Sequence, residues 1–216
     1  PDGNFVVNVF GTAKKSLVSF EPADATEGYD FGKVQVCHTV EWSFVMKNAT
    51  SATADFDYSF ATSLPFAVLP TSGTLGIGSE ATVTVTFHPT AVGATDGTLV
   101  LSSSNPDFTG DVVFDLSGYG VAPDIDTDTE VEFPDTPVRG HSDYSLEIAN
   151  VATSATTGIV LTITNISSGA TDFTIVGPTS ATIATGETKT FTIRFAPSTV
   201  GTISGVVTVY SDDPDT

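Results

Sequence analysis

The sequence predicts an all-β protein built from two tandem immunoglobulin-like β-sandwich domains. Three observations lead to this prediction. Similar segments recur about 100 residues apart, apolar and polar residues alternate along nearly every segment, and no window of ten residues shows helical periodicity. Roughly seven short strands per hundred residues, separated by turn residues, are typical of a sandwich of two sheets.

The internal repeat defines the expected domains. Residues 83–107 (VTVTFHPTAVGATDGTLVLSSSNPD) align without a gap with residues 191–215 (FTIRFAPSTVGTISGVVTVYSDDPD), at an offset of 108. Residues 31–48 align with residues 133–150 at an offset of 102. A short Gly/Pro junction at residues 120–123 separates the copies. We therefore expect domains at residues 14–122 and 123–216, preceded by a separate segment, residues 1–13.

The alternation assigns a core to each copy, because side chains two residues apart lie on the same face of a strand. β-branched residues are frequent in these segments, as strands prefer. The residues expected at the centre of the first core are Trp42, Phe44, Phe56, Val85 and Phe87. Those expected at the centre of the second are Tyr144, Leu146, Leu161, Ile193 and Phe195.

Several short motifs recur in both copies. A strand beginning with Phe31-Gly32 precedes a strand ending in Lys47-Asn48, and an F-x-P-x-x-x-G segment and an S-x-(N/D)-P-D turn follow. This arrangement resembles the ASH/Hydin-type immunoglobulin-like domain, called the choice-of-anchor D repeat in bacterial surface proteins. The likeness covers nearly the whole chain, and the second copy departs from it at Phe133-Pro134. It implies non-catalytic spacer or assembly modules, which occur in bacterial surface arrays and in ciliary and centrosomal proteins.

Composition excludes several classes of partner. Lys and Arg total 7 and Asp and Glu 26, so the net charge is −19. This charge repels nucleic acids and anionic membranes, and nothing in the sequence suggests membrane insertion. Abundant Ser and Thr with only 15% charged residues favour an extracellular or cell-surface protein. No signal peptide is present and residue 1 is Pro, so we expect a mature fragment or an excerpt of a longer protein.

Residue patterns that would support catalysis or cofactor binding are missing. His38, His88 and His141 are far apart in sequence and are expected at the surface, and no G-x-S-x-G elbow occurs. The glycines of GTLGIG (residues 73–78) are expected in turns. The single cysteine, Cys37, permits no intrachain disulfide and is expected to be a buried thiol. We therefore predict no enzyme activity, no catalytic residues and no cofactor.

The acidic run DIDTDTEVE has two interpretations. A strand here would place alternate carboxylates on one face, namely Asp124, Asp126, Asp128, Glu130 and Glu132. Such a stripe could bind Ca²⁺, or it could be a solvated edge that resists aggregation; we favour the second and predict no metal site. Asp212, Asp213 and Asp215 leave the same choice open. Asn48 and Asn165 begin sequences that fit the N-glycan acceptor pattern.

The N-terminal segment resembles the end of the first copy. Residues 1–11 (PDGNFVVNVFG) match residues 106–118 (PDFTGDVVFDLSG), and the second copy reaches residue 216 without a counterpart of this strand. Joining the end of one chain to the start of the next would give a hairpin connection one residue longer than in the first copy. Phe5, Val7 and Val9 would then face the core of a second-copy domain.

Three origins of that pairing are open. The segment could be a donor strand that completes a neighbouring subunit, which would produce a head-to-tail filament. It could be the last strand of a preceding repeat in a covalent array, or it could pair within its own chain. We predict an extracellular structural subunit whose partner is itself or an adjacent repeat. The alternatives are the stalk of a surface adhesin and a ciliary scaffold domain.

Overall fold

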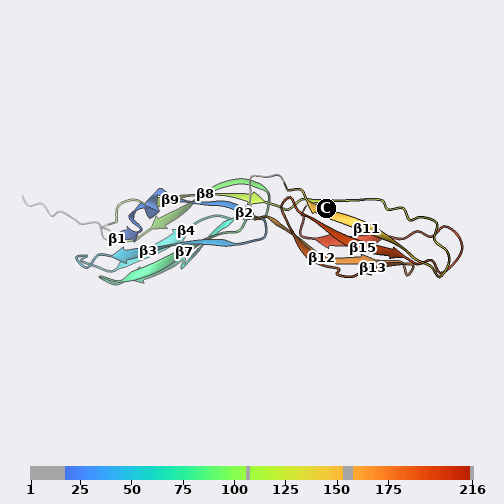
Figure 1. The fold of residues 1–216 in the computed structure, drawn as a ribbon. Coiled ribbons are helices and arrows are strands. Elements are labelled where there is room, and N and C mark those ends of the chain that lie inside the picture. Colours follow the sequence, from blue (N-terminus) through green and yellow to red (C-terminus); the bar gives the residue numbers. More distant parts are fainter. Residues whose placement is uncertain (1–17, 106–107, 153–157, 215–216) are drawn as a thin grey trace, which may run out of the picture. The chain divides into compact units, whose positions relative to one another are not determined.

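Two compact units make up the chain, residues 1–119 and residues 120–216. The computed structural model describes residues 18–105, 108–152 and 158–214. Within those residues the protein is all-β, as predicted, and one short 3₁₀ helix, η1 (Ala23–Glu27), interrupts the strands (Figure 1). In the same part of the chain, no helix is long and apolar enough to cross a bilayer.

Unit 1 is a sandwich of two sheets. One sheet has the strand order β1-β3-β7-β5, and the other has the order β2-β9-β8-β4-β6. The strands are β1 (Val18–Glu21), β2 (Tyr29–Gln35), β3 (Val40–Asn48), β4 (Phe56–Ala61), β5 (Phe66–Leu69), β6 (Ser72–Leu75), β7 (Glu80–Phe87), β8 (Gly93–Ser102) and β9 (Val112–Val121).

Unit 2 repeats this arrangement with fewer strands. Its sheets have the orders β10-β11-β15-β13 and β14-β12-β16. The first corresponds to β1-β3-β7-β5, and the second corresponds to β6-β4-β8. The strands are β10 (Ile125–Thr127), β11 (Ser142–Asn150), β12 (Val160–Ser168), β13 (Phe173–Val176), β14 (Ala181–Ala184), β15 (Thr188–Phe195) and β16 (Val207–Ser211). In the described part of unit 2, no strand corresponds to β2 or β9.

Each unit has its own apolar core, and the predicted strand registers are confirmed. Phe44, Phe56, Val85 and Phe87 are buried in unit 1, where half-buried Trp42 packs against them. In unit 2 the buried residues include Leu146, Leu161 and Ile193, with Tyr144 half-buried beside them. Phe195 is only half-buried, unlike its counterpart Phe87.

A buried asparagine ends the equivalent strands β3 and β11. Asn150 Nδ2 donates to the carbonyls of Ile183 (3.0 Å) and Ile159 (3.4 Å), and its Oδ1 accepts from the N–H of Ala152 and Asp124. These bonds replace water for backbone groups that the turn leaves unpaired. Asn48 Nδ2 similarly donates to Ala54 and Leu75.

The prediction for Cys37 was wrong, and the acidic run does not have the strand geometry that a calcium stripe would need. Cys37 is exposed, because it follows the inward-facing Val34 and Val36 in alternation and lies in the turn after β2, at φ 64°. The acidic run is not one continuous strand, since β10 ends at Thr127 and residues 128–138 carry no strand. The carboxylates of this run therefore do not form the single strand face that the alternation would require.

Candidate functional site

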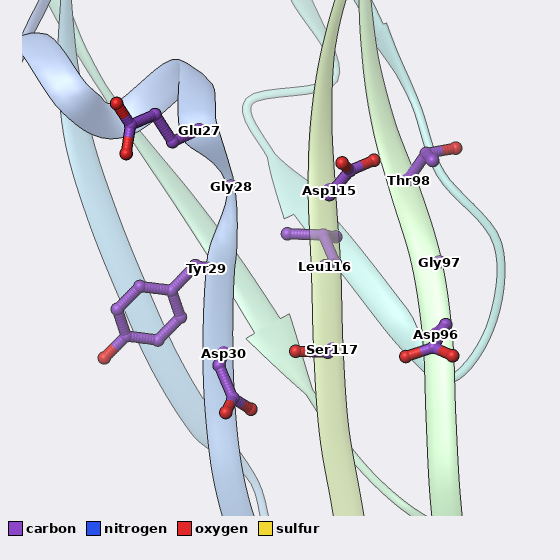
Figure 2. A pocket seen from close by; sticks show the side chains of 10 residues that line it. All are labelled: Glu27, Gly28, Tyr29, Asp30, Asp96, Gly97, Thr98, Asp115, Leu116 and Ser117. Carbon is purple, nitrogen blue, oxygen red and sulfur yellow. The ribbon is translucent and has the colours of Figure 1, made fainter.

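In unit 1, β9 occupies an inner position of its sheet. It lies between β2 and β8, and Figure 2 shows Leu116 and Ser117 on the middle strand, between Tyr29 and Gly97. Phe114 and Leu116 of β9 point into the core and are 0% and 2% exposed. The strand therefore joins β2 to β8 within one sheet, and its buried side chains fill the space between the two sheets.

Glycines allow β9 to approach its neighbours closely. A Cβ on Gly118 would lie 2.5 Å from Phe87 Cε1, so only glycine fits against this ring. Gly28 has φ +97°, and a Cβ there would lie 2.0 Å from the carbonyl oxygen of Asp115 in the hollow of Figure 2. These contacts fix how β9 sits between β2 and β8.

The corresponding position in unit 2 is an open groove of about 1080 Å³. β16 is the last strand of its sheet, and it pairs with β12 on one side. Residues 127–138 form one wall of the groove and residues 199–209 form the other. The groove therefore lies where β9 lies in unit 1.

The floor of the groove is apolar and consists of core residues. It is made by Leu146, Phe173, Ile193, Phe195, Val207 and Val209. Val207 and Val209 are half-buried, whereas their counterparts Leu99 and Leu101, on β8 beside β9, are 0% exposed. Beside them, Val206 is 71% exposed. Among the residues that the structure describes, none covers the core of unit 2 at this strand position.

The outer wall of the groove corresponds to β2. Residues 131–137 match Tyr29–Gln35 at the offset of 102, but they form no strand. This wall carries the carboxylates of Asp128, Glu132 and Asp135, and no Lys or Arg is among the described residues that line the groove. The rim is therefore acidic above an apolar floor.

The sequence predicted an incomplete second sandwich, but it did not identify the groove residues. The alignment of β8 with β16 could have found Val207 and Val209, since it pairs them with Leu99 and Leu101. The predicted interface residues Phe5, Val7 and Val9 lie outside the described residues.

The acidic residues considered for calcium are dispersed. Asp124, Asp126, Asp128, Glu130 and Glu132 are all exposed. Across the described ranges, no group of three or more His, Cys, Asp or Glu side chains could hold a metal ion. Asp212 and Asp213 instead accept backbone hydrogen bonds from Thr162 (2.7 Å) and Ile125 (2.9 Å). Asp215 lies outside the described residues.

The remaining candidate residues have structural positions. His38, His88 and His141 are exposed, as expected. Gly73 lies in β6 rather than in a turn, and Gly78 lies in a turn with φ +75°. Of the two glycan acceptor patterns, the Asn48 amide is buried and donates to two carbonyls, whereas Asn165 is exposed on β12. A glycan on Asn48 is incompatible with this fold.

Two polar contacts on unit 2 shift pKa values. The guanidinium of Arg194 donates two bonds of 2.7 Å to Asp143, which lowers the pKa of that carboxyl. The Tyr144 hydroxyl donates to Asp128 at 2.6 Å, and this bond raises the pKa of Tyr144 because ionisation would remove it. The first contact joins the neighbouring strands β11 and β15, and the second joins Tyr144 of β11 to the wall of the groove.

Comparison with known families identifies both units. A family model described as the HYDIN/CFA65/VesB-like Ig-like domain matches residues 19–114. The family model of the ASPM-SPD-2-Hydin (ASH) domain matches residues 121–215. The chain belongs to the ASH/Hydin-type immunoglobulin-like domains. These families are structural domains and not enzyme families.

Solved structures similar to this ASH/Hydin-type pair share little sequence with it. A protein of unknown function from Porphyromonas gingivalis is 15% identical, with 93% of this chain and 94% of that chain covered and a TM-score of 0.39. The human CEP192 PapD-like domain 7 is 17% identical, with 55% and 94% covered and a TM-score of 0.40. The Vibrio cholerae secreted serine protease VesC is 14% identical, with 88% and 52% covered and a TM-score of 0.33. None of the curated proteins matches this chain.

Proposed function

We propose that this ASH/Hydin-type pair is an extracellular structural subunit that assembles head to tail by β-strand complementation. Residues 4–10 of one copy enter the groove of unit 2 in the next copy and form the missing strand. The observation that carries the proposal is the groove itself, which occupies in unit 2 the place that β9 fills in unit 1.

The chemistry of the segment fits the groove. Residues 5–10 (FVVNVF) are uncharged and alternate, so that Phe5, Val7 and Val9 would face the apolar floor. Burying each such side chain contributes ~1.5–3 kcal/mol, and the strand would also pair the free edge of β16. This gain supports a stable contact between copies.

The distribution of charge also supports the insertion of this segment into the groove. Two of the seven basic residues of the chain, Lys14 and Lys15, lie four and five residues after Phe10, while the rim of the groove carries Asp128, Glu132 and Asp135. Opposite charges accelerate encounter and disfavour the reversed strand direction. A contact between unlike surfaces of identical copies repeats without closing, which gives a filament.

The surface composition supports an extracellular location. Ser and Thr are abundant, only 15% of residues are charged, and the net charge of −19 keeps such assemblies soluble. A non-catalytic domain pair of this kind would act mechanically, as a spacer or fibre on a cell surface.

The test compares two substitutions in the full chain. Val7→Asp places a charge on the floor of the groove and should abolish assembly, whereas Val6→Asp places the same charge on the outward face and should leave it intact. Sedimentation velocity and electron microscopy measure the assembly, and circular dichroism checks that both variants stay folded.

The outcomes separate the alternatives. Filaments of the wild type and of Val6→Asp, with monomers of Val7→Asp, support the proposal. A wild type that stays monomeric at every concentration would overturn the proposal and leave two origins, a neighbouring repeat of a longer chain and pairing within the same chain.

A further inference from the structure

We infer that Gly11 sets the register of the inserted strand by lying against Phe195, as Gly118 lies against Phe87. This inference rests on the proposed strand complementation and adds the residue pair that selects one alignment. It also predicts which segments the groove rejects, namely strands with a side chain at this position.

The structure of unit 1 shows why a glycine is needed. A Cβ on Gly118 would lie 2.5–2.9 Å from three ring atoms of Phe87, a separation that real Cβ atoms do not reach. Phe87 cannot move aside, because it is fully buried and packs between Phe31 and Phe66, with ring centroids 5.6 and 5.1 Å away. The glycine therefore covers a rigid aromatic surface.

Unit 2 contains the same aromatic cluster. Phe195 packs against Phe133 and Phe173, with ring centroids 5.5 and 4.9 Å away. Phe133 and Phe173 are themselves 5.7 Å apart, against 5.9 Å for Phe31 and Phe66. Phe173 also contacts Gly205 as Phe66 contacts Gly97, since an added Cβ would meet a ring carbon at 2.8 Å in both. In unit 2, however, Phe195 lines the open groove.

The number of residues between Gly11 and the first strand of unit 1 supports this position. Val18 lies opposite Asn48 in unit 1, and Ile125 lies opposite Asn150 in unit 2, so these two residues are equivalent. Counting back the same seven residues from each reaches Gly11 and Gly118. Residues 5–18 thus align without a gap with residues 112–125. The link from the inserted strand to the next unit has the same length as the link between the two units of one chain.

A shift of the strand would lose this fit. Side chains of a strand return to the same face every second residue, so a two-residue shift places Val9 or Ala13 over Phe195. Gly11 is the only glycine in residues 4–18. One alignment therefore satisfies both the alternation of Phe5, Val7 and Val9 and the aromatic cluster.

The experiment uses the full chain with Val7→Asp as the acceptor, because its own segment no longer competes. Fluorescent peptides of residues 1–13 are titrated against it: wild type, Gly11→Val, and Thr12→Val as the matched control. Thr12 corresponds to Tyr119, which is 42% exposed, so valine there meets no core. Valine also favours strands, so any loss at position 11 comes from the contact and not from strand propensity.

The expected result is that Gly11→Val binds at least about tenfold more weakly than the wild type, while Thr12→Val stays within about threefold. On an acceptor that also carries Phe195→Leu, the difference between the two variants should shrink. Equal affinities of Gly11→Val and Thr12→Val, with the wild type bound, would overturn the inference but leave strand complementation standing. No binding of the wild-type peptide would overturn complementation itself, and the inference with it.

Discussion

Phe114 of β9 stacks on Phe44 of β3 across the two sheets of unit 1, with ring centroids 5.1 Å apart and ring planes at 23°. Phe20 of β1 packs edge-on against the ring of Phe114, with ring centroids 5.4 Å apart. The side chain of Phe114 therefore contacts both β1 and β3 of the opposite sheet. The counterpart of Phe44 in unit 2 is Leu146, which lines the groove. We therefore expect this ring contact to stabilise unit 1, whereas unit 2 has a leucine at the position of Phe44.

Phe114→Ala should lower the free energy of unfolding of unit 1 by ~3–5 kcal/mol, because it removes a fully buried ring and leaves a cavity. The matched control is the adjacent Val113→Ala, whose side chain is 49% exposed and should cost under ~0.5 kcal/mol. Urea unfolding monitored by the single tryptophan, Trp42, reports on unit 1 alone. Equal effects of the two changes would show that β9 does not face the core.

Asn150→Ala should destabilise unit 2 by at least ~2 kcal/mol. The substitution leaves the buried carbonyl of Ile183 and the N–H of Ala152 without their partner, and each such loss costs ~1–3 kcal/mol. Asn165→Ala, on the exposed face of β12, is the control and should change stability by less than ~0.5 kcal/mol. Thermal unfolding followed by calorimetry measures both, and a neutral Asn150→Ala would contradict the structural role of this amide.

The alternation of side chains predicted most of the fold, because the buried face of a strand appears in the sequence as apolar residues at every second position. It placed Phe44, Val85, Leu146 and Ile193 correctly in the two cores. It placed Cys37 wrongly, because Val34 and Val36 take the inward positions and the strand ends at Gln35, which leaves Cys37 exposed in the following turn. Local patterns do not show where a strand stops.

The groove depends on a relation between distant segments, and for that reason only its existence could be predicted. Residues 131–137 align with β2 but form no strand: Pro134 and Pro137 lack the N–H that a strand ladder uses, and the described part of unit 2 contains no strand beside them. The same absence leaves Val207 and Val209 half-buried. The hydrogen bond of Asp213 likewise required the structure, because the sequence left a calcium ligand as an open alternative and did not indicate a bond to the N–H of Ile125.

The Arg194–Asp143 pair should make the stability of unit 2 depend on pH at the acidic end. Arg194 lowers the pKa of Asp143 in the folded state, so folding is favoured by the ionised carboxylate. This contribution is fully present above the unfolded pKa and is lost as the pH falls through the lower, folded pKa. Asp143→Asn should therefore be less stable than the wild type at neutral pH and equally stable below that folded pKa. Urea midpoints at both pH values measure the difference.

Asp126→Asn is the control for that prediction, because Asp126 is exposed and belongs to none of the ion pairs between described residues. It should leave the pH dependence close to that of the wild type. An Asp143→Asn variant whose deficit persists unchanged at acidic pH would show that the side chain acts through packing and not through its charge.

Filling the groove should convert residues 131–137 into a strand. Their counterpart in unit 1, β2, is a strand that pairs with β9, so an inserted strand would supply the missing partner. In the Val7→Asp chain, saturating peptide of residues 1–13 should slow amide hydrogen exchange in residues 131–136 at least about tenfold. The effect should be limited to alternate amides among Val131, Glu132, Phe133, Asp135 and Thr136, because an edge strand directs only every second N–H to its partner and Pro134 and Pro137 have no amide hydrogen. Exchange in Tyr29–Gln35 of unit 1 serves as the internal control and should not change. Bound peptide with unchanged exchange in residues 131–136 would mean that the strand pairs with β16 alone and that the outer wall of the groove stays open.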